Sequence, residues 1–164
     1  MSWSIGHADA CEIDAFGIVP ATRLAMRRAV EALSPPPDAL IIDALRLPGV
    51  ELPQRAFNFA DAISLSVAAA SILAKVARDR TMIDLAAEQS GYGFDRHKGY
   101  GTRAHQAALK SMGVCEAHRK TFKPIQALSA QPGRRDWPVL IETAEDAESA
   151  KDLPSSLRPW RSPR

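Results

Sequence analysis

The order of apolar and polar positions predicts a domain that mixes short strands with longer helices. Alternating large and small residues predict a strand at residues 3–8, and short runs bounded by turn residues predict strands at 39–43 and 55–61. Apolar residues spaced three or four apart predict helices over residues 21–33, 62–89 and 102–112. Thr102 has the residue type that commonly caps the start of a helix.

Two of the predicted strands end in an acid. ALIID closes on Asp43 and RAFNFAD closes on Asp61. Carboxylates at one edge of a sheet would repel each other unless a cation lay between them, and Mg²⁺ prefers such oxygen ligands. Metal ions held in this way can activate water and stabilise a leaving oxygen. The alternative is that both acids are ordinary caps or turn formers.

The long predicted helix and the loop after it have unusual compositions. Residues 64–74 are rich in alanine and serine, which predicts a slim helix that packs closely between other elements. The loop at residues 91–102, GYGFDRHKGYGT, combines glycines with two tyrosines, a histidine and a lysine. The histidines at 97, 105 and 118 follow no recognised metal-ligand spacing, so we expect them on the surface.

The charge is distributed unevenly along the chain. Residues 1–74 carry five basic and eight acidic side chains, whereas residues 75–123 carry ten basic and five acidic ones. Basic patches attract phosphate chains, so the middle of the sequence is a candidate nucleic-acid surface. The alternative is an ordinary solvated helix surface.

Length and composition suit one domain with a tail. We place the domain at residues 1–125 and a proline-rich, mobile tail at residues 126–164. No apolar run approaches the ~18 residues that span a bilayer, and the first residues lack a secretory signal. Cys11 and Cys115 are far apart and outside any metal-ligand spacing. These features favour a cytoplasmic protein with reduced thiols and no membrane partner.

Three segments resemble ribonuclease HII, and the resemblance extends over roughly residues 3–125. They are IIDALRLP at 41–48, FADAISLSVAAASILAKVARDR at 59–80 and the glycine-rich loop at 91–102. The resemblance implies an α/β protein with a ribonuclease H-like fold, a mixed sheet flanked by helices. It also implies an endoribonuclease that cleaves the RNA strand of RNA–DNA hybrids and nicks DNA containing ribonucleotides. Mn²⁺ or Mg²⁺ would be the cofactor, with no small-molecule cofactor.

The resemblance also assigns roles to individual residues. Asp43 and Asp61 fall on metal-binding, catalytic acids of the family, and Tyr100 falls on the tyrosine that packs against the sugar beside the scissile junction. The resemblance implies two further roles more weakly. Phosphate contacts would come from Lys98, Arg46 and Lys75, and Asp79 would support the metals indirectly.

The sequence departs from the family pattern in three places. The family's first two strands, which carry an Asp-Glu pair and a Gly-Arg-Gly turn, have no counterpart here. Phe59 stands where the family usually has lysine, and Ala44 stands where it usually has glycine. Because half of the expected carboxylates are absent, we expect this chain alone to be weakly active or inactive. The alternative function is a non-catalytic remnant that binds nucleic acid.

Overall fold

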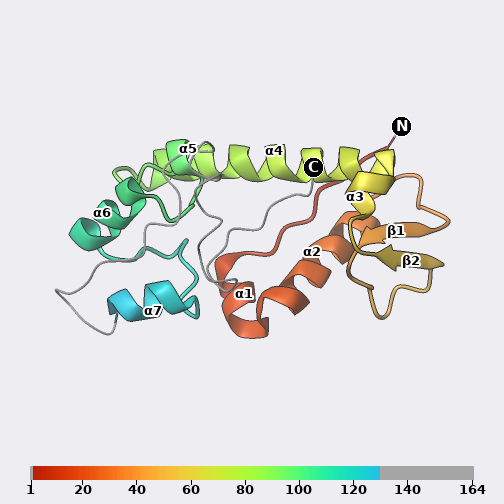
Figure 1. Ribbon diagram of the computed structural model, residues 1–164, viewed down its shortest axis with the longest axis horizontal. Coiled ribbons are helices and arrows are strands. Elements are labelled where there is room, and N and C mark those ends of the chain that lie inside the picture. The colour runs from red at the N-terminus through yellow and green to blue at the C-terminus, as the bar shows by residue number, and fades with distance from the viewer. Residues whose placement is uncertain (1, 130–164) are drawn as a thin grey trace. The chain divides into compact units, whose positions relative to one another are not determined.

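The computed structural model describes residues 2–129, which form two compact units (Figure 1). Of the described residues, 2–77 belong to the first unit and 78–129 to the second. The predicted tail from residue 130 onward lies outside the described residues.

The first unit is built on a small parallel sheet with helices packed on it. Its elements in chain order are α1 (Ala10–Phe16), α2 (Ile18–Glu31), β1 (Leu40–Asp43), β2 (Gln54–Phe57), α3 (Ala60–Ile63) and the start of α4 (Leu65–Glu88). Leu40 pairs with Gln54, and Asp43 pairs with Phe57. The apolar side chains of β1 form a core with Leu47, against which α2 packs. This arrangement confirms the predicted α/β class and the strand that ends at Asp43.

The predicted strand at residues 3–8 is wrong. This segment has no strand partner among the described residues and instead lies against α2. The Ser4 hydroxyl donates to Ala29 O, and Arg28 Nη1 donates to His7 O at 2.6 Å. Gly6 permits the approach, because a Cβ atom there would lie 1.9 Å from Ala25 O. The alternating pattern thus reflects packing on a helix backbone.

Replacing Gly6 with alanine is expected to destabilise the first unit. The added methyl would overlap the backbone of α2, and forced shifts of that kind cost about 1–3 kcal/mol. Urea denaturation followed by circular dichroism measures the loss. Gly113→Ala is the matched control for added bulk, since a Cβ there meets nothing within 4 Å, although its φ of 79° adds strain of its own. Equal stability of the Gly6→Ala protein and the unchanged chain would contradict this packing.

Up to residue 129, the second unit contains the rest of α4 and three shorter helices. They are α5 (Phe94–His97), α6 (Arg103–Met112) and α7 (Lys123–Ser129), and α7 crosses the predicted domain boundary at residue 125. The core joins Tyr92 and Phe94 to α6 and to Ile125 of α7. The Thr102 hydroxyl accepts from His105 N at 3.2 Å, which confirms the predicted cap of α6.

The long helix differs from its prediction in two ways. It is interrupted at Ser64, so that α3 and α4 are separate helices. No residue of α4 is buried, and Leu65 and Ile72 are 86% and 65% exposed. The prediction of close packing is therefore wrong. The helix is long compared with the width of the sheet. Its 24 residues extend about 36 Å, whereas the two paired strands found within residues 2–129 lie roughly 5 Å apart.

Within the same residues, no helix has both the length and the hydrophobicity that a membrane-spanning segment requires.

Candidate active site

Asp43 is the last residue of β1 and is half-buried. Its Oδ1 atom accepts a hydrogen bond of 3.1 Å from the backbone N of Ala60, which begins α3 and is fully buried. The strand end is therefore tied directly to the start of the helix that follows β2. This bond orients the Asp43 carboxylate toward α3.

Asp61 is not at the end of a strand as predicted. β2 ends at Phe57, and Asp61 lies in the first turn of α3, with its Oδ1 atom buried. The chain turns into α3 at Phe59, which has a left-handed backbone with φ 62° and ψ 34°. Because Ala60 contacts the Asp43 carboxylate and Asp61 is the next residue, both acids belong to one corner of the first unit. A separation of about 4–7 Å between their carboxylates, which one or two ions can bridge, stays a prediction.

Left-handed backbone conformations occur at or near several predicted site residues. Among residues 2–129, three residues other than glycine have positive φ: Ala44 at 60°, Phe59 at 62° and Lys98 at 49°. Ala44 follows Asp43, Phe59 precedes Asp61 by two positions, and Lys98 is itself a predicted contact. Such backbone costs about 1–2 kcal/mol per residue and tends to cluster at functional sites. Ala44 and Phe59 lie beside the two acids of the first unit, whereas Lys98 belongs to the second unit.

Replacing Ala44 with glycine is expected to stabilise the first unit by about 1 kcal/mol, because glycine adopts positive φ without a Cβ clash. The matched control is Ala56→Gly in β2, where the same change in a strand interior should destabilise by about 0.5–1 kcal/mol. Thermal and urea unfolding measure both. Destabilisation of similar size at both positions would show that the Ala44 backbone is not strained.

The chemistry of Asp43 and Asp61 suits a hard divalent cation. Mg²⁺ commonly binds to one or two carboxylates and completes its octahedron with water and substrate phosphates. Across residues 2–129, no group of three or more His, Cys, Asp or Glu side chains is placed to hold a metal ion. An ion held by Asp43 and Asp61 would therefore take its remaining ligands from water and phosphate.

The predicted nucleic-acid loop presents Tyr100 to solvent. Its side chain is 47% exposed, and the Arg78 guanidinium lies 5.4 Å from the ring centroid. Arg78 Nη2 also donates to Lys98 O at 2.9 Å. The Lys98 ammonium donates to Asp95 O, so it is turned toward its own loop. Tyr100 is accordingly the better placed of the two predicted contacts.

The remaining predicted residues are divided between the units. Arg46 and Lys75 are exposed in the first unit, and Arg46 lines a depression of about 290 Å³ beside Gln54. Asp79 belongs to the second unit, where its Oδ1 lies 3.9 Å from Arg78 Nη1. The structure therefore gathers Asp43 with Asp61 in one unit, and Lys98 with Tyr100 in the other.

The three histidines of the second unit are buried, which corrects the expectation that they lie on the surface. His97, His105 and His118 are only 8%, 5% and 7% exposed. The His97 and His105 rings stack with centroids 4.3 Å apart, and His105 Nε2 lies 3.1 Å from His118 Nε2. A sequence signal existed for His105, which shares the buried face of α6 with Ala108 and Leu109 at helical spacing.

Acid is expected to destabilise the second unit through His105 and His118. Burial lowers the pKa of His105 from 6.5 to about 4 and lowers the pKa of His118 as well. Between these pH values the unfolded chain binds protons that the native state does not, so stability is complete above pH 6.5 and falls toward pH 4. The His105 shift corresponds to about 3 kcal/mol. Urea unfolding at pH 7, 5.5 and 4 measures the slope, which His105→Asn should flatten.

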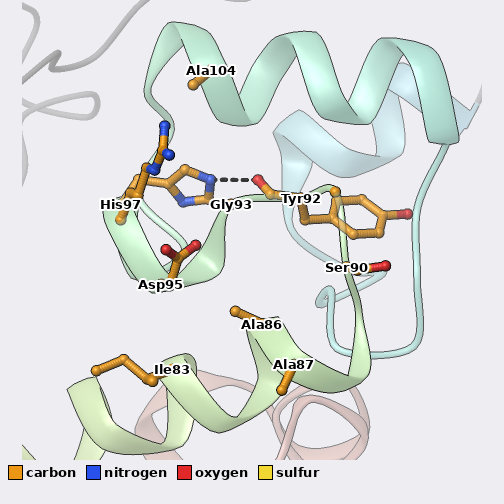
Figure 2. A pocket seen from close by; sticks show the side chains of 11 residues that line it. Ile83, Ala86, Ala87, Ser90, Tyr92, Gly93, Asp95, His97 and Ala104 are labelled. Carbon is orange, nitrogen blue, oxygen red and sulfur yellow. Dashed lines mark hydrogen bonds between the residues drawn. The ribbon is translucent and has the colours of Figure 1, made fainter.

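A depression of about 610 Å³ lies beside the loop in the second unit. Figure 2 shows Ile83, Ala86 and Ala87 of α4 on one wall and Asp95 and His97 on the other. Its lining includes neither Tyr100 nor the two acids of the first unit. This depression is therefore separate from the predicted catalytic residues.

Comparison with known proteins identifies the family. The ribonuclease HII family description matches residues 3–125. Curated relatives named ribonuclease HII include those of Roseiflexus castenholzii, 52% identical over 125 residues, and Nitrosococcus oceani, 48% identical over 126 residues. These alignments cover 76% and 77% of this chain but 56% and 63% of the relatives.

A third relative, from Dehalococcoides mccartyi, is 46% identical over 128 residues, which cover 78% of this chain and 61% of that protein. The chain thus spans between about half and two thirds of the length of the curated relatives that it matches. The matched region contains both acids, the long helix and the glycine-rich loop. The chain belongs to the ribonuclease HII family.

Proposed function

We propose that the chain serves in metal-assisted hydrolysis of phosphodiester bonds in the RNA strand of RNA–DNA hybrids and beside ribonucleotides embedded in DNA. The observation that carries the proposal is the hydrogen bond from Ala60 N to Asp43 Oδ1. It joins one acid to the helical turn that bears the other, Asp61. Family membership supports the substrate class.

Asp43 and Asp61 are the proposed ligands for Mn²⁺ or Mg²⁺. When bound, such an ion activates water and stabilises the leaving oxygen of an in-line displacement. The bond from Ala60 holds the Asp43 carboxylate in place, so little ordering remains to be done when the ion binds. The buried Oδ1 of Asp61 lies in a region of low dielectric, where its attraction to a cation is stronger than in water.

Tyr100 is proposed to pack against the sugar beside the scissile bond, since its ring is exposed and an aromatic face suits this contact. Arg46, Lys75 and Lys98 are the proposed phosphate contacts, and Asp79 is proposed to support the metals indirectly. The basic residues of segment 75–123 supply the electrostatic attraction to the duplex, which should weaken steeply with salt.

A second candidate is a non-catalytic protein that binds nucleic acid. It is favoured by one observation: within residues 2–129, no group of three or more His, Cys, Asp or Glu side chains could hold a metal ion. Two carboxylates without further ligands bind divalent ions weakly. Under this alternative the basic segment binds hybrids without cleaving them.

The test is a gel assay on a fluorescent DNA duplex that carries one ribonucleotide, with Mg²⁺ or Mn²⁺. It compares this chain, the same chain extended upstream by its own coding sequence, and Asp61→Asn variants of both. The proposal predicts weak nicking at most by the short chain, and strong nicking by the longer one that Asp61→Asn abolishes. Binding without nicking by both forms would establish the alternative.

We also place the protein in the cytoplasm, with nucleic acid as its partner. Cys11 and Cys115 are both free thiols, which suits a reducing compartment. Fractionation of cells that express a tagged chain tests the location.

A further inference from the structure

The loop that carries Tyr100 is held at four successive residues through their backbone groups. Lys98 O accepts from Arg78 Nη2 at 2.9 Å, and Gly99 N donates to His97 Nδ1 at 3.2 Å. Tyr100 O lies 2.9 Å from His105 Nδ1, and Gly101 O accepts from Gln106 Nε2 at 2.9 Å. Of the four side chains, only that of Arg78 is exposed; the other three are buried.

These contacts determine which nitrogen of His105 carries the proton. A carbonyl oxygen only accepts, so Nδ1 of His105 is protonated and donates to Tyr100 O. In the neutral ring, Nε2 is then an acceptor, and the hydrogen between it and His118 Nε2, 3.1 Å away, belongs to His118. Nδ1 of His118 is then an acceptor, and its 3.3 Å approach to Cys115 O, which also only accepts, carries no hydrogen bond.

Cys115 completes the chain. Its backbone N donates to His118 Nδ1 at 3.2 Å, and its Sγ lies 3.0 Å from the same nitrogen. The bonds thus run in one direction, from Cys115 through His118 and His105 to Tyr100 O. His97 is oriented separately, because its Nε2 donates to Tyr92 O at 2.7 Å (Figure 2).

Burial keeps this chain neutral and ordered. The lowered pKa values of His105 and His118 leave both rings uncharged near pH 7. Phe94 contacts both rings at 5.5 Å between centroids and separates them from solvent. The thiol acts here as a hydrogen-bond donor.

We propose that the hydrogen-bonded chain Cys115–His118–His105 is a positioning device, which holds the backbone of Tyr100 so that its exposed ring is aimed at the nucleic acid. His105 is the positioning residue, since of the three it is the one that bonds to the backbone of Tyr100. The role of the ring in binding rests on the proposed function. The single tautomer of His105 and the ordered backbone of the loop do not depend on the proposed function.

The first test reads the tautomer in the unmodified chain. Labelling with ¹⁵N-histidine and long-range ¹⁵N–¹H spectra at pH 7 should show His105 protonated at Nδ1 and His118 protonated at Nε2. The opposite tautomer at His105, or a mixture in fast exchange, would overturn the proposal whether or not any variant folds.

The second test uses a matched pair of variants at one position. In His105→Asn the amide nitrogen reaches the place of Nδ1 and can still donate to Tyr100 O, whereas in His105→Gln it reaches the place of Nε2 and cannot. The NMR shifts of the Tyr100 ring should stay near those of the unmodified chain in the first variant and move toward random-coil values in the second. Equal changes in both variants would mean that His105 is merely a core residue.

Binding provides a third measurement on the same proteins. Affinity for a duplex with one ribonucleotide should fall about tenfold in His105→Gln, as expected for loss of roughly one contact, and less in His105→Asn. Unchanged affinity in His105→Gln would overturn the proposal. If even the unmodified chain fails to bind this duplex, the proposed function fails, while the tautomer and ring shifts still decide whether His105 positions the loop.

Discussion

Replacing Phe94 with alanine is expected to lower the free energy of unfolding of the second unit by about 3–5 kcal/mol. The side chain is 2% exposed and its ring stacks on that of Tyr92, with centroids 5.3 Å apart. The rings of His97, His105 and His118 surround it at 5.5–5.9 Å between centroids. Its removal leaves a cavity among polar rings that cannot collapse without breaking their hydrogen bonds.

Urea unfolding followed by tyrosine fluorescence and amide exchange measures this loss. Phe122→Ala is the matched control in the same unit, because Phe122 is 41% exposed and packs under Arg119 at 4.6 Å. We expect the control to cost about 1 kcal/mol or less, since a cation–π contact at an exposed site is worth about that much. Similar losses at both positions would contradict the packing seen around Phe94.

In the chain extended upstream, replacing Asp61 with asparagine is expected to lower metal-dependent nicking about 10²–10³-fold, the usual cost of losing one interaction that stabilises the transition state. Asparagine keeps the shape of the side chain and removes its charge, so the fold should be retained. Binding of Mn²⁺, measured by electron paramagnetic resonance, should weaken in parallel. Asp43→Asn is expected to act in the same way.

Asp38→Asn is the matched control, because Asp38 is an exposed acid in the same unit that precedes β1. It should change neither Mn²⁺ binding nor nicking. Asp43→Ala separates the two roles of Asp43: it also deprives Ala60 N of its acceptor, which should cost a further 1–3 kcal/mol of stability. Full Mn²⁺ affinity in Asp61→Asn would remove Asp61 from the proposed metal site.

The sequence alone determined the features that depend on neighbouring residues. The cap at Thr102 and the strand that ends at Asp43 follow from local chemistry, and the structure has both. The three family segments are contiguous, so their resemblance could be recognised without any fold. The sequence also selected Asp43 and Asp61 together as candidate metal ligands. The predicted strand ends indicated them first, and the family resemblance indicated them again.

Tertiary structure alone decided which groups are buried and what they contact. The Asp43 carboxylate meets a backbone group 17 residues away, and this bond, with the left-handed Phe59, places Asp61 in a helix rather than a strand. Position 6 requires glycine because the backbone of α2 at Ala25, 19 positions along the chain, leaves no room for a Cβ atom. His105 and His118 are 13 residues apart in the sequence. Folding removed both rings from water, which keeps them neutral and fixes which ring donates the hydrogen bond between them. Hydrogen bonds and desolvation between distant residues leave no local pattern, so the sequence could not show them.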